Sequence, residues 1–309
     1  MRTRTRIRLV LVAALAGFVA TAGCAGSASS SATTTAGGTS VAPAANLDSP
    51  DIEGLFDVGG HRLYLACTGD GPVTVVYVHG WVDNTTYVPH NSATAIRDLL
   101  SDDFRVCLYD RRNVGSSDTV DAVQSPADMQ HDMESVLAAG GVKPPYILMA
   151  ASFGGLVASQ YLAAHPDDVV GMVLIDTMFP DELRLDPFIP REFRFEYYRK
   201  DDRCCSVERI AQYDLVKGLQ HSIGREPEIP VVYLASQQQP RTDNPFGSPK
   251  YDARIVDALA AYVDRFSPGI LRQVDAPHFM EPVVPDVIAD AVREVAGLAG
   301  EAAERVEDD

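Results

Sequence analysis

Ser152 lies where the chain changes from one local pattern to another, and its position is typical of a nucleophile. Residues 147–149 are an apolar run like a buried strand, and the segment after the serine has helical spacing. Small residues, Ala150 and Gly154, lie two positions before and two after it, with Gly155 next. A tight strand-to-helix turn needs such small neighbours and lifts its central side chain above the sheet edge. A base beside the exposed hydroxyl would make it a nucleophile.

Other residues that could take part in chemistry follow apolar runs elsewhere. Of the seven histidines, only His278 lies after the last apolar run and before the last helix-like segment. Asp176 ends the run 168–176, and Asp243 comes shortly after three glutamines at 237–239. The sequence has no CxxC pair and no His-rich spacing, so it contains no pattern that predicts a metal site or a cofactor.

Strand-like and helix-like segments alternate from residue 55 onward. One helix should begin after Ser125 as N-cap, with Pro126 in its first turn, and stop at Gly140. The alternation predicts an α/β fold with a doubly wound, mostly parallel, eight-stranded sheet and helices on both faces. The expected strands are two within 54–69, joined by a turn at Gly59 and Gly60, then 73–80, 104–110, 146–150, 168–176, 230–236 and 270–277; further helices are expected to end near Ala164 and to span 250–265 and 284–298.

The bend at Ser152 resembles the nucleophile elbow of the α/β-hydrolase superfamily, with Ala150 in place of the usual first glycine. The motif HGW at 79–81 is similar to the family's His-Gly-x after an early strand, and YDRRNVGSSD at 109–118 resembles its loop after the fourth strand. Asn113 stands in that loop where a glycine is common. The resemblance covers about residues 50–298 and implies a serine mechanism.

The resemblance also implies roles for single residues. In the family, the residue after His-Gly and the residue after the nucleophile each lend a backbone N–H to the oxyanion hole; here these are Trp81 and Phe153. The family's catalytic histidine lies in the loop before the last helix, which makes His278 the expected base for Ser152. His79 is expected to be structural.

The catalytic acid is the member of the triad with two candidates. Most of the superfamily places it just after the seventh strand, where this chain has glutamines at 237–239. A neutral amide cannot stabilise an imidazolium as a carboxylate does. Asp176 follows the sixth strand, an alternative position used by some members, and Asp243 lies a few residues beyond the glutamines. Of the two, Asp176 is the preferred acid.

The implied function is hydrolysis of a small-molecule carboxylic ester or other acyl substrate through an acyl-enzyme on Ser152. Dehalogenases and epoxide hydrolases of this superfamily have an aspartate at the nucleophile position, which disfavours their chemistry here. Peptide cleavage, acyl transfer, lyase chemistry and cofactor-free haloperoxidation use similar triads and remain alternatives. A different class is a non-catalytic binding or envelope lipoprotein with the same fold, which the glutamines at 237–239 favour.

Residues 177–229 interrupt the alternation and are rich in aromatic and charged side chains. Such an insertion could fold over the carboxyl edge of the sheet as a lid, or be a surface elaboration that contacts no substrate. As a lid, it would set the selectivity for the acyl chain through Phe188, Phe193, Phe195, Tyr197 and Tyr198.

The N-terminal region has the pattern of an export signal. Four arginines precede an apolar run at 9–20, which is too short for an ordinary membrane span, and small residues lead to Cys24. These residues resemble the lipobox of bacterial lipoproteins, although Thr21 replaces the usual leucine. We therefore expect a signal peptide at 1–23, a lipid anchor on Cys24 as the only membrane contact, a flexible linker to 46, and a folded domain at 47–309; plain secretion is the alternative.

The net charge limits the class of partner that the protein can bind, and the positions of the cysteines limit the disulfides that it can form. The net charge of −17, which loss of the four leader arginines makes more negative, argues against binding of nucleic acid. The superfamily's strand order would place Cys67 and Cys107 side by side, as a disulfide or as two buried thiols. Cys204 and Cys205 could bridge to each other or stay free.

Overall fold

The structure of the chain is a computed structural model that describes residues 51–82, 87–190, 207–240 and 248–307. Cys24, Asp243, Cys204, Cys205 and the aromatic residues at 193–198 lie outside these ranges. Within them, no helix combines the length and the apolar character that a membrane span requires.

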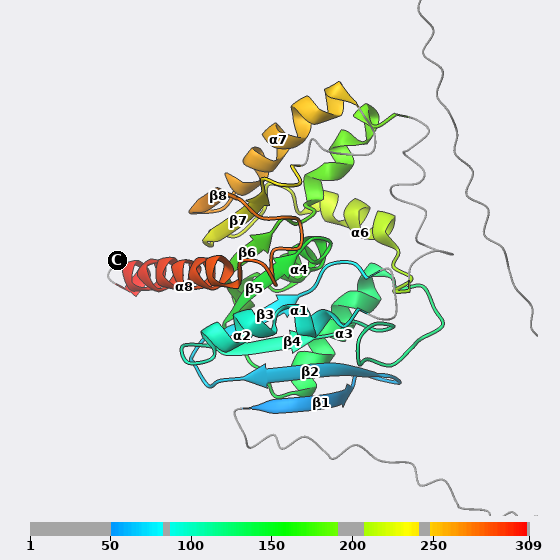
Figure 1. Cartoon of the computed structure of the whole chain (residues 1–309), viewed down its shortest axis with the longest axis vertical. Coiled ribbons are helices and arrows are strands. Elements are labelled where there is room, and N and C mark those ends of the chain that lie inside the picture. The colour runs from blue at the N-terminus through cyan, green and yellow to red at the C-terminus, as the bar shows by residue number, and fades with distance from the viewer. Residues whose placement is uncertain (1–50, 83–86, 191–206, 241–247, 308–309) are drawn as a thin grey trace, which may run out of the picture. The chain divides into compact units, whose positions relative to one another are not determined.

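An eight-stranded sheet in the order β1-β2-β4-β3-β5-β6-β7-β8 forms the centre of the described domain (Figure 1). The pairs β1–β2 and β2–β4 are antiparallel, and every other adjacent pair is parallel. This confirms the predicted fold class. The strands are β1 (Ile52–Asp57), β2 (Arg62–Thr68), β3 (Thr74–Val78), β4 (Arg105–Tyr109), β5 (Tyr146–Ala151), β6 (Val169–Ile175), β7 (Val231–Ser236) and β8 (Gly269–Val274).

The helices follow the sequence signals where these were strong. In α3 the side chain of Ser125 accepts a hydrogen bond from the Asp128 N–H, the Asp128 carboxylate accepts one from the Ser125 N–H, and Gly140 caps the other end. The last helix continues beyond the expected residue 298, through a segment rich in good helix formers. The helices are α1 (Pro89–Ser92), α2 (Thr94–Leu100), α3 (Pro126–Ala139), α4 (Gly154–Ala164), α6 (Gln212–Gly218), α7 (Pro249–Val263) and α8 (Pro285–Glu307), with 3₁₀ turns η1 (Pro166–Asp168), η2 (Pro180–Phe188) and η3 (Leu219–His221).

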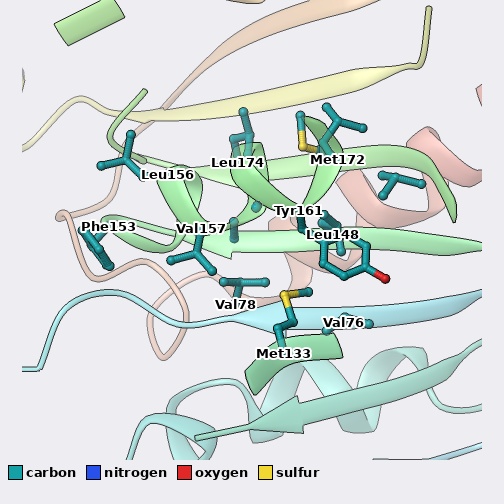
Figure 2. Close-up of a cluster of buried hydrophobic side chains, with 14 of the residues drawn as sticks. Val76, Val78, Met133, Leu148, Phe153, Leu156, Val157, Tyr161, Met172 and Leu174 are labelled. Carbon is teal, nitrogen blue, oxygen red and sulfur yellow. The ribbon is translucent and has the colours of Figure 1, made fainter. Parts of the chain in front are cut away.

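Each face of the sheet has its own apolar core. Side chains alternate across a strand, so Val76 and Val78 of β3 pack on one face, while Val75 and Tyr77 pack on the other. The first face is covered by α3, α4, α6 and α7, and the second by α2 and α8. Figure 2 shows part of the first core, where side chains of α4 lie beside those of β3, β5 and β6. Burial on both faces explains why these strands are nearly continuous apolar runs.

The described parts of the insertion, 177–190 and 207–229, pack against the helices of the first face. The contacts join η2 to α7, and α6 to both α3 and α4. Phe188, one of the aromatic residues expected in a lid, packs against the core, with the Arg254 guanidinium 4.2 Å from its ring centroid. Phe188 therefore has a structural role in packing against the core and Arg254.

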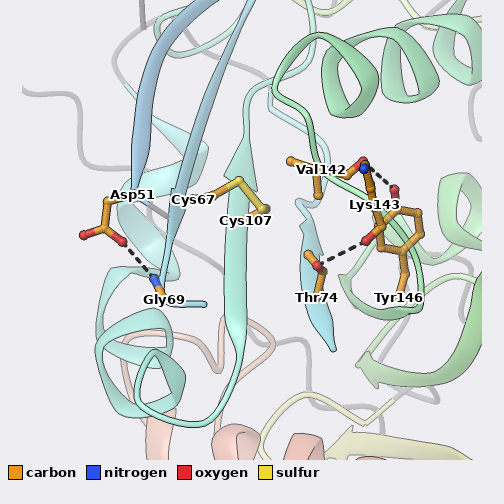
Figure 3. The surroundings of a disulfide bond; sticks show 8 residues. All are labelled: Asp51, Cys67, Gly69, Thr74, Cys107, Val142, Lys143 and Tyr146. Atoms are coloured by element: carbon orange, nitrogen blue, oxygen red, sulfur yellow. Dashed lines mark hydrogen bonds between the residues drawn. A yellow bond between two sulfur atoms is a disulfide. The ribbon is translucent and has the colours of Figure 1, made fainter. Parts of the chain in front are cut away.

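A disulfide joins Cys67 to Cys107 across the antiparallel pair β2–β4 (Figure 3). The two residues face each other in the register of these strands, and both are buried. The bridge closes a loop of 40 residues near one edge of the sheet. Such a loop restricts the unfolded chain and stabilises the folded one.

We expect the Cys67→Ala/Cys107→Ala double variant to lose about 2–4 kcal/mol of unfolding free energy, because the unfolded chain regains the entropy of the open loop. Urea unfolding followed by circular dichroism measures this. A reductant should lower the stability of the wild type toward that of the variant and leave the variant unchanged. An equal effect of reductant on both proteins would contradict the assignment.

Candidate active site

Ser152 occupies a strained turn between β5 and α4. Its φ of +49° lies in the left-handed region, which costs a non-glycine residue of the order of 1 kcal/mol or more. Backbone hydrogen bonds hold the turn in place: the Ser152 N–H donates to Ile175 O at 3.1 Å, and the Met178 N–H donates to Ser152 O at 2.9 Å. Neighbouring strand ends therefore maintain the strained conformation.

The small residues around the serine are required by close backbone contacts. A Cβ on Gly154 would lie 2.1 Å from Val78 O, and one on Gly155 would lie 2.4 Å from Thr177 Cβ. A Cβ on Gly80 would lie 3.0 Å from Ser152 Cβ. Ala150, which replaces the family's glycine, is fully buried in β5. The side chain of Ala150 thus fits within β5, whereas a side chain at Gly80, Gly154 or Gly155 would come too close to neighbouring atoms.

His278 lies in the loop after β8, between Ser152 and Asp176. Its Nε2 is 3.0 Å from Ser152 Oγ, and its Nδ1 is 2.7 Å from Asp176 Oδ2. A carboxylate can only accept a hydrogen bond, so Nδ1 carries the proton and Nε2 is left to accept the serine proton. The Asp176 side chain is 6% exposed, while that of His278 is 30% exposed. The imidazole is therefore open to solvent on one side and held by a buried carboxylate on the other.

Asp176 also depends on the strand next to it. It has a φ of +44°, its N–H donates to Leu234 O at 2.8 Å, and its Oδ1 accepts from the Ser236 N–H at 3.3 Å. These contacts with β7 direct the carboxylate across the end of that strand toward the loop after β8. Asp243, the other candidate acid, lies outside the described residues.

The glutamines after β7 take a role that the sequence did not suggest. The side-chain oxygen of Gln239 accepts a hydrogen bond from the His278 N–H at 2.9 Å. The Gln239 N–H donates to Ser236 Oγ at 2.9 Å, and this hydroxyl donates to Ala276 O at 2.7 Å. A neutral side chain at the family's usual acid position thus binds the backbone of the histidine loop.

The two residues expected to supply the oxyanion hole flank Ser152 from different elements. Phe153 is the N-cap of α4, and its N–H donates no hydrogen bond to another described residue. The N-terminal end of a helix favours negative charge. Trp81 follows Gly80, which lies next to Ser152, and residue Trp81 is 36% exposed.

His79, the other histidine near this edge, is completely buried. Its Nε2 accepts from the Arg111 N–H at 3.1 Å, and its Nδ1 donates to Gly80 O at 2.7 Å. Burial lowers the pKa of His79 well below the ordinary value, and the charge of Arg111 lowers it further. A neutral imidazole with this tautomer stabilises the turn. Among the described residues, no group of three or more His, Cys, Asp or Glu side chains could hold a metal ion.

Comparison with known proteins agrees with this architecture. Residues 73–202 match a family model described as the alpha/beta hydrolase fold. The uncharacterised protein YqjL of Bacillus subtilis is 29% identical over 43% of this chain and 50% of its own length. A pimeloyl-[acyl-carrier protein] methyl ester esterase of Chromobacterium violaceum is 29% identical over 49% of this chain and 50% of its own. The chain therefore spans only about half the length of these curated relatives.

Solved structures cover more of the chain at lower identity. A thermophilic esterase from Thermogutta terrifontis has a TM-score of 0.56 and 18% identity, covering 80% of this chain and 98% of its own. A putative alpha/beta hydrolase from Nostoc sp. PCC 7120 has a TM-score of 0.60 and 17% identity, with coverage of 80% and 98%. The chain thus has the α/β-hydrolase fold, which the match at residues 73–202 and these solved structures share.

Proposed function

We propose that the protein is a serine hydrolase that cleaves carboxylic esters, with Ser152 as nucleophile, His278 as base and Asp176 as acid. The observation that carries the proposal is the line of two hydrogen bonds, 2.7 Å from His278 Nδ1 to Asp176 and 3.0 Å from His278 Nε2 to Ser152 Oγ. Three side chains far apart in sequence meet in the order that proton transfer requires.

The reaction follows from this geometry. Ser152 Oγ attacks the ester carbonyl while its proton passes to His278 Nε2. The negative oxygen that forms is stabilised by the N–H groups of Trp81 and Phe153. The imidazolium then gives its proton to the leaving alcohol, and an acyl-enzyme remains on Ser152. Water, deprotonated by the same imidazole, attacks the acyl group and releases the carboxylic acid and the free serine.

Asp176 stabilises the imidazolium that forms in both steps. Its carboxylate is almost completely shielded from water, so its attraction for the nearby positive charge is stronger than in solution. The same hydrogen bond keeps the imidazole in the tautomer that can accept the serine proton. The contact of the Asp176 carboxylate with the imidazole supports catalysis over the alternative of a non-catalytic binding protein, which the glutamines after β7 favoured.

Ester cleavage is preferred among the reactions open to this arrangement. The curated relative from Chromobacterium violaceum is named as a methyl ester esterase, and the solved structure from Thermogutta terrifontis as an esterase. The fold is also shared with a haloalkane dehalogenase from Bradyrhizobium elkanii, at a TM-score of 0.57 and 14% identity. The hydroxyl of Ser152 distinguishes the proposed chemistry from that of the superfamily's dehalogenases, which have an aspartate there.

A fluorophosphonate probe tests whether Ser152 is an activated nucleophile. We expect labelling of the wild type and none of Ser152→Ala, because among the described residues only this serine has its hydroxyl within hydrogen-bond distance of a histidine that is held by a buried carboxylate. Ser135→Ala is the matched control, since Ser135 lies 3.4 Å from His131 Nε2 on the surface of α3. Intact protein mass measures the labelling. A folded wild type that takes up no probe would refute the proposal.

Substitution of the two candidate acids tests the triad. We expect Asp176→Asn to lower kcat for an activated ester by about 10³–10⁴-fold, since the amide favours the wrong tautomer and carries no charge. Asp243→Asn should keep kcat near that of the wild type. Steady-state kinetics on folded variants, checked by thermal unfolding, gives both values. The opposite order of the two rates would assign the acid to Asp243.

We also propose that the protein is exported and anchored by lipid on Cys24, a residue outside the described structure. Metabolic labelling with an alkyne fatty acid in a bacterial host should mark the wild type. The Cys24→Ser variant should lose the label, because it lacks the thiol that is acylated, while Cys204→Ser should keep it. Equal labelling of all three proteins would place any acylation elsewhere.

A further inference from the structure

Arg111 and Glu208 form an ion pair in the interior, close to the candidate site. Arg111 lies in the loop after β4, and Glu208 belongs to the insertion at 177–229. Arg111 Nε is 2.8 Å from Glu208 Oε2, and a terminal guanidinium nitrogen is 3.0 Å from Oε1. Their side chains are 3% and 0% exposed. The pair is therefore bidentate and shielded from water.

The pair binds the backbone on both sides of Trp81. One terminal nitrogen of Arg111 donates to His79 O and the other donates to Gly80 O, each at 2.8 Å. Glu208 Oε1 accepts from the Val82 N–H at 2.7 Å. The residue between these anchored positions is the one whose N–H we assign to the oxyanion hole. The orientation of its peptide group thus depends on the carbonyl of Gly80, which Arg111 holds.

Arg111 remains charged in this environment. Burial alone would lower its pKa, but the charge of Glu208 and the hydrogen bonds between the two groups outweigh burial, so the pKa lies above the ordinary value. The guanidinium also lies 5.5 Å from the centroid of the Phe153 ring. A fixed positive charge therefore lies beside both residues of the proposed oxyanion hole.

Glu208 is itself tied to the body of the domain. Its backbone carbonyl accepts hydrogen bonds from the side chains of Asn113 and Gln124. The Gln124 N–H donates to Arg209 O at 2.7 Å, and the Ala211 N–H donates to Gln124 O at 2.9 Å. These contacts fix the position of Glu208 in the insertion relative to the loop after β4.

An ion pair of this kind is a poor source of stability. The loss of hydration of two buried charges offsets most of their attraction, and well-packed apolar residues are often as stable. A buried pair that makes three hydrogen bonds to the backbone of one turn does, however, define the geometry of that turn. The structure therefore points to a role in positioning.

We propose that Glu208, acting through Arg111, positions the turn 79–82 so that the Trp81 N–H faces the oxyanion. The insertion thereby contributes a positioning residue to the site. This role rests on the proposed function. Glu208 touches neither the substrate nor the reacting atoms, and its effect passes through the backbone of residues 79–82.

Glu208→Gln keeps the size of the side chain and removes its charge. We expect kcat to fall by about 10–100-fold with little change in KM, which is less than the roughly 10²–10³-fold cost of losing an oxyanion donor outright. The rate of labelling by a fluorophosphonate should fall in parallel. Glu208→Asp keeps the charge on a shorter side chain, so its kcat and its labelling rate should lie between those of the wild type and those of Glu208→Gln. This variant replaces Glu208→Gln in the test if Glu208→Gln does not fold.

Asp132→Asn is the matched control. Asp132 forms a buried bidentate pair with Arg112, at 2.6 and 2.7 Å, and within the described structure neither side chain forms a hydrogen bond or ion pair with residues 79–82. We expect Asp132→Asn to lower the melting temperature while leaving kcat near that of the wild type. If Glu208 had a merely structural role, Glu208→Gln and Asp132→Asn would lose the same amount of kcat for the same loss of melting temperature.

Hydrogen exchange gives a readout that does not need activity. The Val82 N–H should exchange faster in Glu208→Gln than in the wild type, and at the wild-type rate in Asp132→Asn. An active wild type with Glu208→Gln at wild-type kcat and labelling rate would overturn the positioning role alone. A folded wild type without activity or labelling would overturn the proposed function and this role with it, even if Val82 exchange responds to Glu208→Gln.

Discussion

The arrangement of the site depends on the hydrogen bond between Asp176 and His278, which crosses the end of β7. Asp176 follows β6, and His278 lies after β8, so the strand between them has to leave room for this contact. It does so with Ser236 and Gln239, whose hydrogen bonds hold the aspartate on one side and the histidine loop on the other. Ser152, in the strained turn after β5, then lies within hydrogen-bond distance of the imidazole.

This constraint explains why strain is concentrated at two neighbouring strand ends. Ser152 and Asp176 both have positive φ, and each is held by backbone hydrogen bonds to an adjacent strand. Parallel strands end at a common edge, so side chains that follow β5, β6 and β8 meet there. The two apolar cores on the faces of the sheet supply the rigidity that keeps such unfavourable conformations populated.

Polar groups around this edge are buried in pairs, and their contacts are directed at backbone groups. Neutral His79 bridges two turns, and Arg111 of the Arg111–Glu208 pair holds the carbonyls of His79 and Gly80. The insertion at 177–229 is connected to this network by Glu208. Its packing on α3, α4 and α7 and its hydrogen bonds to the 113–124 loop link it to the same edge of the sheet.

Local signals in the sequence accounted for most of the fold. The order of strands and helices, the capping of α3 and the bend at Ser152 all follow from short-range patterns, because apolar periodicity, proline and small residues act on their immediate neighbours. The short helices α1, α2 and α6 were not predicted, since segments of four to seven residues carry too few turns for a periodic signal.

The sequence by itself determined which serine lies on a strand-to-helix bend and which histidine lies in the last loop. Tertiary structure decided the rest of the candidate site: which aspartate approaches the imidazole, the disulfide between Cys67 and Cys107, the contact of Gln239 with the histidine loop, and the pairing of Arg111 with Glu208. These contacts join residues 39 to 102 positions apart. Local patterns carry no information about partners at such separations, because strand order and loop packing bring them together only in the folded chain.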